Sequence, residues 1–284
     1  MGDSLFDQTM VDMKWPEIEK AATEGAIVLL PTGVIEEHGP HMGLGVDALC
    51  SVLSCRLVKK NLEEEGIRAL IAPPYYWGIN TATGAFPGSF TVRKDTMKAV
   101  LYDILICLKR WGFTYVFNLN WHGDEDQITA VLEAIREARG DSGVKAYSIL
   151  RAFDVRRLKM TGDEPYVLVQ QDGFSPAPRS NYLEIHAESF ETGLMAAYFP
   201  DHVDTALAKT LKSTDLTVED LMVWAKGGDE ARKVTPLGYF GDPAGFDPKA
   251  ARAQLERHTK NSAALIARFL KGEYRAPSVK AQST

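Results

Sequence analysis

The sequence predicts an α/β fold, built as a three-layer sandwich with a mostly parallel central sheet and helices on both faces. Two observations carry this prediction. Short continuous apolar runs have the pattern of strands that are buried on both faces. Segments whose apolar residues recur at helical spacing follow these runs after short connections. The length of 284 residues suits one large domain, and no repeat or linker divides the chain, so we expect a single domain over residues 1–284.

The elements are expected in strict alternation at first. Continuous apolar runs predict strands at 26–30, 69–72, 115–119 and 144–150, the second of which is stopped by two prolines. Helical periodicity predicts helices at 47–62, 97–108 and 128–139, the last stopping at Gly140.

The rest of the chain is less regular. Residues 154–182 mix apolar pieces with Gly, Pro and Asp, which predicts loops around an active site. A helix at 186–199 is followed by a polar stretch and by an amphipathic helix at 250–270. We expect the core within residues 14–200, packing or oligomer contacts from 201–284, and a frayed tail at 277–284.

Composition narrows the class of function. The net charge of −6 argues against nucleic acid or an anionic membrane as a partner. No apolar run approaches the roughly 20 residues that span a bilayer, and no secretory signal is visible. Three sparse cysteines indicate reduced thiols rather than disulfides. We therefore expect a cytoplasmic protein whose partner is a small-molecule substrate.

The densest group of potential metal ligands follows the first strand. It consists of Glu36, His38, His41 and Asp47. Carboxylate oxygens and neutral imidazoles are ligands that Zn²⁺, Mn²⁺ and Fe²⁺ prefer. Because alternate residues of an extended segment point the same way, Glu36 and His38 are expected to share a pocket while Glu37 turns away. Helix capping is the structural alternative for Asp47.

Two later clusters are expected at the same edge of the sheet. His122 and Asp124 follow the third strand, and Glu184, His186 and Glu191 surround the start of a helix. The carboxyl ends of parallel strands meet at one edge, so these side chains are expected near the first cluster. Together they offer about six ligands with a bridging carboxylate, as two metal ions need.

Some of these residues have structural alternatives. Asp124 could be a helix N-cap, with Glu125 and Asp126 as the relevant acids or as a solvated turn. His202 and His258 lie in surface-like sequence and are expected to be non-functional.

Candidate substrate contacts lie in the same loops. Trp77, Phe86 and Trp121 are expected either to anchor loops or to form the apolar wall of a pocket. His41 and Ser89 are further candidates for contacting the substrate, and the loop region adds polar side chains that would suit a hydroxylated ring: Gln170, Gln171, Arg179 and Asn181.

These motifs, in this order, resemble the creatininase family of metal-dependent amidohydrolases. Residues 30–42 with Asp47 are similar to its first signature, and 86–89, 118–122 and 186–192 are similar to later ones. The resemblance spans roughly residues 14–200. It implies a doubly wound α/β sandwich, a binuclear Zn or Mn centre with Fe as a third option, and a homo-oligomer, commonly a hexamer.

The resemblance also implies metal-binding roles. Glu36, Asp47 and His122 would bind one metal ion. His38 and Asp47 would bind the second, with Asp47 as the bridge. Its last ligand would be Glu191, or alternatively Asp124, which stands at the position that creatininase uses.

His186 would be the general acid/base. Ile185 stands where creatininase has a catalytic glutamate, so Glu184 or Glu188 would have to supply the proton-relay carboxylate. Gly193 stands where a serine is usual. These departures argue against creatinine itself as the substrate.

The implied reaction is hydrolysis of a small cyclic polar substrate, in which a metal-bridged hydroxide attacks a carbonyl carbon. The bond cleaved would be the C–N bond of a cyclic amide or formamide. An alternative is C–C hydrolysis of a cyclic diketone such as a keto-inosose, which needs the same electrophilic metal. A third hypothesis, favoured by Ile185, is a non-catalytic metal-binding module.

Overall fold

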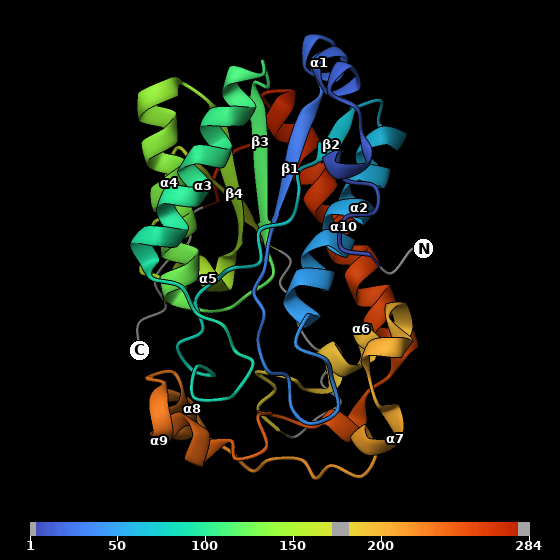
Figure 1. Cartoon of the computed structure of the whole chain (residues 1–284), viewed down its shortest axis with the longest axis vertical. Coiled ribbons are helices and arrows are strands. Elements are labelled where there is room, and N and C mark those ends of the chain that lie inside the picture. The colour runs from blue at the N-terminus through green and yellow to red at the C-terminus, as the bar shows by residue number, and fades with distance from the viewer. Residues whose placement is uncertain (1–3, 172–181, 278–284) are drawn as a thin grey trace.

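The central sheet has five parallel strands in the order β2-β1-β3-β4-β5. The structure is a computed structural model that describes residues 4–171 and 182–277 (Figure 1). The strands are β1 (Ile27–Thr32), β2 (Ala69–Ile71), β3 (Tyr115–Asn120), β4 (Lys145–Arg151) and β5 (Val167–Gln170). The predicted α/β class with a mostly parallel sheet is confirmed.

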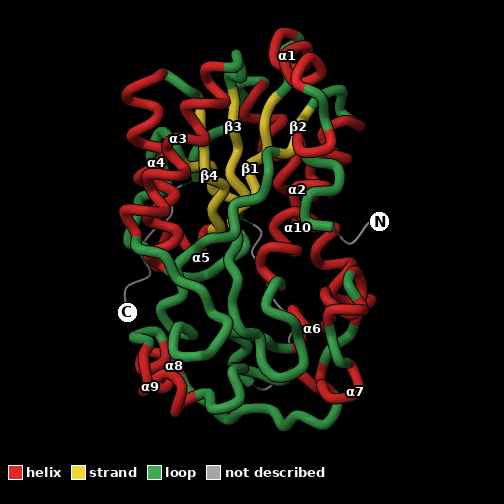
Figure 2. The backbone as a smooth tube through the Cα atoms, viewed as in Figure 1, coloured by secondary structure: helices red, strands yellow, loops and turns green. Residues whose placement is uncertain are grey.

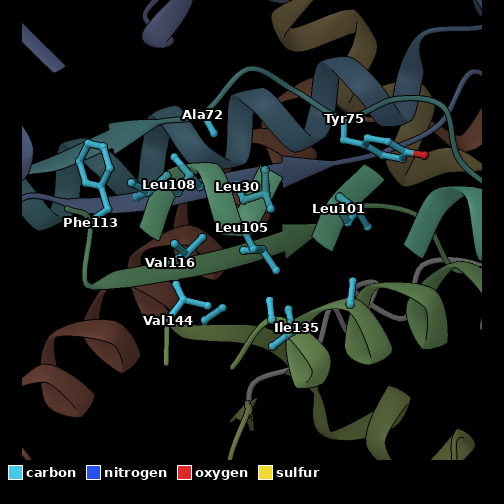
Figure 3. Close-up of a cluster of buried hydrophobic side chains, with 14 of the residues drawn as sticks. Leu30, Ala72, Tyr75, Leu101, Leu105, Leu108, Phe113, Val116, Ile135 and Val144 are labelled. Atoms are coloured by element: carbon cyan, nitrogen blue, oxygen red, sulfur yellow. The ribbon is translucent and has the colours of Figure 1, made fainter. Parts of the chain in front are cut away.

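Helices cover both faces of the sheet and explain the continuous apolar strands. One face packs against α1 (Trp15–Thr23), α3 (Lys94–Arg110) and α4 (Glu125–Ser142), and the other against α2 (Val46–Glu64) and α10 (Pro248–Leu270). Val28 and Leu30 of β1 belong to the first core, part of which Figure 3 shows, and Ile27 and Leu29 belong to the second. Burying each such side chain contributes about 1.5–3 kcal/mol.

The strand order reverses between β1 and β3, which lie side by side. Thr32 pairs with Asn120 at the carboxyl ends of these strands. The buried Asn118 donates to the Leu30 carbonyl (3.1 Å) and to Thr32 Oγ1 (2.9 Å), so its polar side chain is satisfied inside the sheet. Ligand sites of open α/β sheets form beyond the carboxyl ends of strands at such a reversal. Figure 2 shows loops gathered at this end of the molecule.

Two expectations about element boundaries were wrong. The segment predicted as loops from residue 154 holds the end of α5 (Ala152–Arg157) and strand β5, whose four buried residues are too few to show a period. Helix α4 continues through Gly140 and ends before Gly143, which adopts a φ of 69° and so permits the left-handed C-cap. Arg179 and Asn181 lie outside the described residues.

The helices between β5 and α10 lie beyond the strand ends (Figure 1). The expected polar stretch contains three short helices, and a longer helix, α6, precedes it. The helices here are α6 (Ser189–Tyr198), α7 (Thr205–Ala208), α8 (Val218–Trp224) and α9 (Gly228–Val234), with 3₁₀ turns at η2 (Pro200–His202) and η3 (Pro243–Gly245). A further 3₁₀ turn, η1 (Met10–Asp12), precedes α1. Within the described residues, no helix combines the length and apolarity needed to cross a membrane.

Candidate metal centre

The loop after β1 is pressed against the first turn of α2. At Gly33 a Cβ atom would lie only 2.6 Å from the Asp47 carbonyl oxygen, so only glycine permits this approach. Asp47 lies in that first turn and is buried, whereas the N-cap position belongs to Gly45. The carboxylate of Asp47 is therefore free of a capping role and is directed toward the loop that carries Glu36 and His38.

Asp47 lies between two histidines from different loops. Its Oδ2 is 2.9 Å from Nδ1 of His122, and its Oδ1 is 3.5 Å from Nε2 of His38. Glu36 Oε2 also approaches His122 Nδ1, at 3.1 Å. The end of β1, the end of β3 and the start of α2 thus converge, as expected for parallel strands at a reversal of strand order.

The hydrogen bonds of the two histidines fix which nitrogen faces the carboxylates. His122 Nε2 donates to the Ile79 carbonyl (2.9 Å), and His38 Nδ1 to the Glu36 carbonyl (3.2 Å). In the neutral ring, the other nitrogen is then an acceptor. A backbone carbonyl that accepts the second N–H is the usual outer partner of a metal-binding histidine.

Several atoms at the centre of this cluster have no hydrogen-bond partner in the described part of the chain. They are Glu36 Oε2, His38 Nε2 and Asp47 Oδ2, all buried acceptors that face one another. Buried polar groups without partners are rare and costly. A divalent cation would satisfy all three, so the residues present fit a metal centre.

Glu191 from α6 completes a second group. Its Oε2 lies 3.8 Å from His38 Nε2 and accepts a hydrogen bond from the Ala187 N–H at 2.6 Å. Ala187 has a φ of 52°, a strained conformation for a residue with a Cβ, and such strain is concentrated at functional sites. Ligand atoms of His38, Asp47 and Glu191 lie within 4.8 Å of one another, as do those of Glu36, Asp47 and His122. Asp47 belongs to both groups.

The electrostatics of the cluster favour a cation. Burial alone lowers the pKa of His122, but Glu36 and Asp47 outweigh burial and hold this pKa well above its usual value. Burial alone raises the pKa of Glu36, and here the nearby histidines, led by His122, outweigh it and hold the pKa well below its usual value. A field that attracts a proton so strongly also attracts a divalent cation.

His186 is held at the edge of the cluster by the C-terminal segment. Its backbone pairs with Phe240, and its Nε2 donates to the Glu37 carbonyl at 2.8 Å. The ring centroid is 4.3 Å from that of His38 and 5.7 Å from that of Trp224. Trp224 and Phe240 are parts of the site that sequence reasoning missed, because both lie beyond residue 200 in a segment expected only to pack.

Glu37 does not turn away, so that prediction was wrong. The segment after β1 is not regular strand, and the buried Glu37 carboxylate places Oε1 3.6 Å from His186 Nε2. The candidate relay carboxylates are engaged elsewhere: Glu184 Oε2 accepts from the N–H groups of Ser189 and Asp242, and Glu188 caps α6. Glu37 is therefore a carboxylate beside His186 Nε2, and Glu36 also has a ligand atom within 4.8 Å of one on His186.

Asp124 lies outside the cluster. Its Oδ1 accepts from the N–H groups of Asp126 and Gln127, which makes it the N-cap of α4, and its Oδ2 accepts from the Thr81 N–H. Glu125 and Asp126 are exposed and form the solvated acidic turn.

Alanine at Asp124 is expected to lower the free energy of unfolding by about 1 kcal/mol, the effect of a lost N-cap, without changing metal content. Alanine at Glu191 is expected to remove one metal equivalent. Urea unfolding and elemental analysis of both variants check this contrast. Loss of metal from the Asp124 variant alone would reverse the assignment.

Of the candidate substrate contacts, Trp121 lines the cavity described below. Trp77 is half-exposed and packs edge-to-face on Phe90 (5.7 Å), and Phe86 lies under the Arg232 guanidinium (5.1 Å). Neither lines this cavity. Ser89 Oγ accepts from the Glu37 N–H, and the buried His41 has its Nε2 2.8 Å from Thr192 Oγ1.

A cavity of about 250 Å³ opens beside His122 and Glu191. It extends from these residues to the end of β4 and to α10, where His258 and Gln254 line it. His258, which lies in surface-like sequence, is half-buried, and Gln170 Nε2 approaches its Nδ1 at 3.0 Å. His202, by contrast, is exposed.

Burial, together with the charge of Arg151, lowers the pKa of His258 to about 3. The unfolded chain has a pKa near 6.5 here, so it binds more protons than the folded state between these values. The stability that neutral His258 contributes is complete above about pH 6.5 and is lost as the pH falls toward 3.

In the metal-loaded protein, the unfolded chain binds a proton at His258 as the pH falls from about 7.5 to about 5.5. We expect this to lower the free energy of unfolding by about 1.4 kcal/mol. His258→Gln is expected to remove that part of the pH dependence. Urea unfolding of both proteins at the two pH values measures it, and an equal pH dependence in both would refute the assignment.

A family model described as creatinine amidohydrolase matches residues 11–266, and the chain belongs to the creatininase family. Among relatives, a creatinine amidohydrolase from Pseudomonas putida is 28% identical over 214 residues, covering 72% of this chain and 75% of the relative. A mycofactocin precursor peptide peptidase from Mycolicibacterium smegmatis is 23% identical over 218 residues, covering 76% and 74%.

Solved structures share the fold. A manganese creatininase superposes with a TM-score of 0.64 at 20% identity, covering 93% of this chain and 98% of the other. Another creatininase crystal structure gives 0.65 at 21% identity, covering 94% and 99%. A Zn-Zn form of a mutant creatininase gives 0.63 at 21% identity, covering 95% and 99%.

Proposed function

We propose that this protein is a metal-dependent hydrolase that cleaves the C–N bond of a small, polar, cyclic amide. The observation that carries the proposal is the group of buried, unpartnered acceptors around Asp47, beside a cavity of small-molecule size. Glu36, Asp47 and His122 would hold one divalent ion, and His38, Asp47 and Glu191 the other. Zn or Mn is the metal we propose, because creatininases of the same fold include a manganese form and a Zn-Zn form.

When bound, two divalent ions would lower the pKa of a shared water toward neutrality and polarise the substrate carbonyl. The chain's own residues supply the remaining chemistry. Because His186 Nε2 is committed to the Glu37 carbonyl, Nδ1 is the atom through which His186 exchanges a proton with the leaving nitrogen. Two neighbours hold the His186 ring in place: the Glu37 carboxylate lies near its Nε2, and the Trp224 ring packs against it.

The names of the two relatives favour an amide over a cyclic diketone. One is a creatinine amidohydrolase and the other a peptide peptidase, and both names denote cleavage of C–N bonds. Cleavage of a C–C bond in a cyclic diketone and metal binding without turnover are the competing outcomes.

The test is a turnover screen of the metal-loaded protein against cyclic amides, creatinine included, and cyclic 1,3-diketones. Products are identified by mass spectrometry, and the His122→Ala variant serves as the inactive control. Ring opening of an amide by the wild type alone supports the proposal. Turnover of diketones only would move the protein to C–C hydrolysis, and metal binding without any turnover would favour a binding module.

A further inference from the structure

We propose that the substrate of this site carries a carboxylate, which Arg151 binds where the end of β4 lines the cavity. This inference rests on the proposed function and names the substrate class. The cavity is lined by His122 and Glu191 of the candidate metal centre. It is also lined by Arg151 and Asp154, where β4 passes into α5, and by Gln254 from α10.

Arg151 is the arginine that lines the cavity, and Asp154 holds it there. Asp154 is buried, and its carboxylate accepts hydrogen bonds from two guanidinium groups. Arg151 donates through Nε (2.6 Å) and Nη2 (3.0 Å), and Arg157 donates through Nη2 at 3.3 Å. Arg157 also pairs with Glu125 at 3.9 Å. The N–H groups of Arg151 that Asp154 does not bind remain for a ligand in the cavity.

Arg151 can reach a ligand. Its side chain keeps 35% of its surface exposed, although Asp154 fixes the orientation of the guanidinium. A planar guanidinium that is already oriented loses little entropy when it binds a carboxylate. The remaining donors on the group are available without breaking the pair with Asp154.

A second donor in the cavity lining lacks an acceptor. Gln254 Nε2 is buried without a hydrogen-bond partner among the described residues. A carboxylate in the cavity would supply one. His258 beside it is held neutral by its pKa of about 3, so it neither repels nor attracts an anion.

Three further carboxylates line the cavity: Glu184, Glu188 and Glu191. Glu191 belongs to the proposed metal ligands. Burial, followed by the charges of Glu191 and Glu184, raises the pKa of Glu188 well above its usual value. Glu184 accepts hydrogen bonds from two backbone N–H groups. The donors of Arg151 and Gln254 suit a small amide that carries a carboxylate and places its reacting carbonyl beside His122 and Glu191.

The test is calorimetric binding of two matched ligand pairs to the zinc-loaded protein. The pairs are 5-oxoproline with its carboxamide, and N-acetylalanine with its carboxamide. We expect the carboxylate member of at least one pair to bind about 10- to 100-fold more tightly, as one charge-assisted hydrogen-bonded contact provides. Arg151→Met is expected to abolish this preference, and Arg151→Lys to retain part of it.

Arg156→Met is the control, because Arg156 is exposed on the same helix α5. It should keep the full preference. A preference that persists in Arg151→Met would mean that the carboxylate binds the metal ions, and no preference in the wild type would mean that the cavity selects no anion. Either result overturns the inference. Failure of the turnover screen with an intact Arg151-dependent preference would instead refute the hydrolase proposal alone.

Discussion

His122→Ala is expected to remove one metal ion per chain and to abolish turnover. His122 Nδ1 lies within 3.1 Å of oxygens from both Glu36 and Asp47, so alanine leaves two buried carboxylates without the third ligand. Losing one partner of a buried charged cluster costs more than losing a surface contact. Elemental analysis and an activity assay measure the two effects.

His202→Ala is the matched control. His202 is exposed in η2 and is absent from the described groups of ligand atoms. It should keep both metal ions and full activity. If the two variants retain equal metal and equal activity, the metal centre has been misplaced.

His186→Ala is expected to keep both metal ions and to lower kcat by about 10²–10⁴-fold, the usual contribution of a positioned general acid/base. The reason is that the ring is held by Glu37 and Trp224, outside the two groups that share Asp47. Single-turnover rates on an amide found in the screen, together with metal content, measure this.

One result would change the general acid/base role proposed for His186. His186 has a ligand atom within 4.8 Å of those of Glu36 and His38. Loss of a metal ion from His186→Ala would therefore make His186 a metal ligand. Replacement by glutamine, which retains a hydrogen-bond donor to the Glu37 carbonyl, separates misplacement of the loop from loss of the proton-transfer group.

The parts of the fold that the sequence predicted are those with a strong local pattern. Strands β1, β3 and β4 and helices α2, α3 and α10 all appear where apolar periodicity placed them. The convergence of Glu36, Asp47 and His122 could also be foreseen, because a parallel sheet brings the ends of its strands to one edge. Each of these inferences needs only a short stretch of sequence and one rule of sheet geometry.

The remaining features depend on contacts between distant segments. Glu37 meets His186, and Phe240 pairs with the backbone of His186, through contacts that no local pattern reveals. His258 is half-buried because α10 packs beside β5, although its neighbours in sequence are polar. From the sequence, Asp124 could be a metal ligand or a helix N-cap. Its hydrogen bonds to the Thr81 N–H and to the first turn of α4 decide for the N-cap.

We expect Asp47 to be a ligand of both metal ions, and the metal content per chain decides this. Elemental analysis of protein purified without chelator is expected to give two equivalents of Zn or Mn, with Fe as the third option. Asp47→Ala is expected to lose both, because its carboxylate belongs to both groups of ligand atoms. One equivalent would leave a mononuclear centre, contradicting the bridge. No metal, even after Zn²⁺ or Mn²⁺ is added back, would mean that these residues do not form a metal centre.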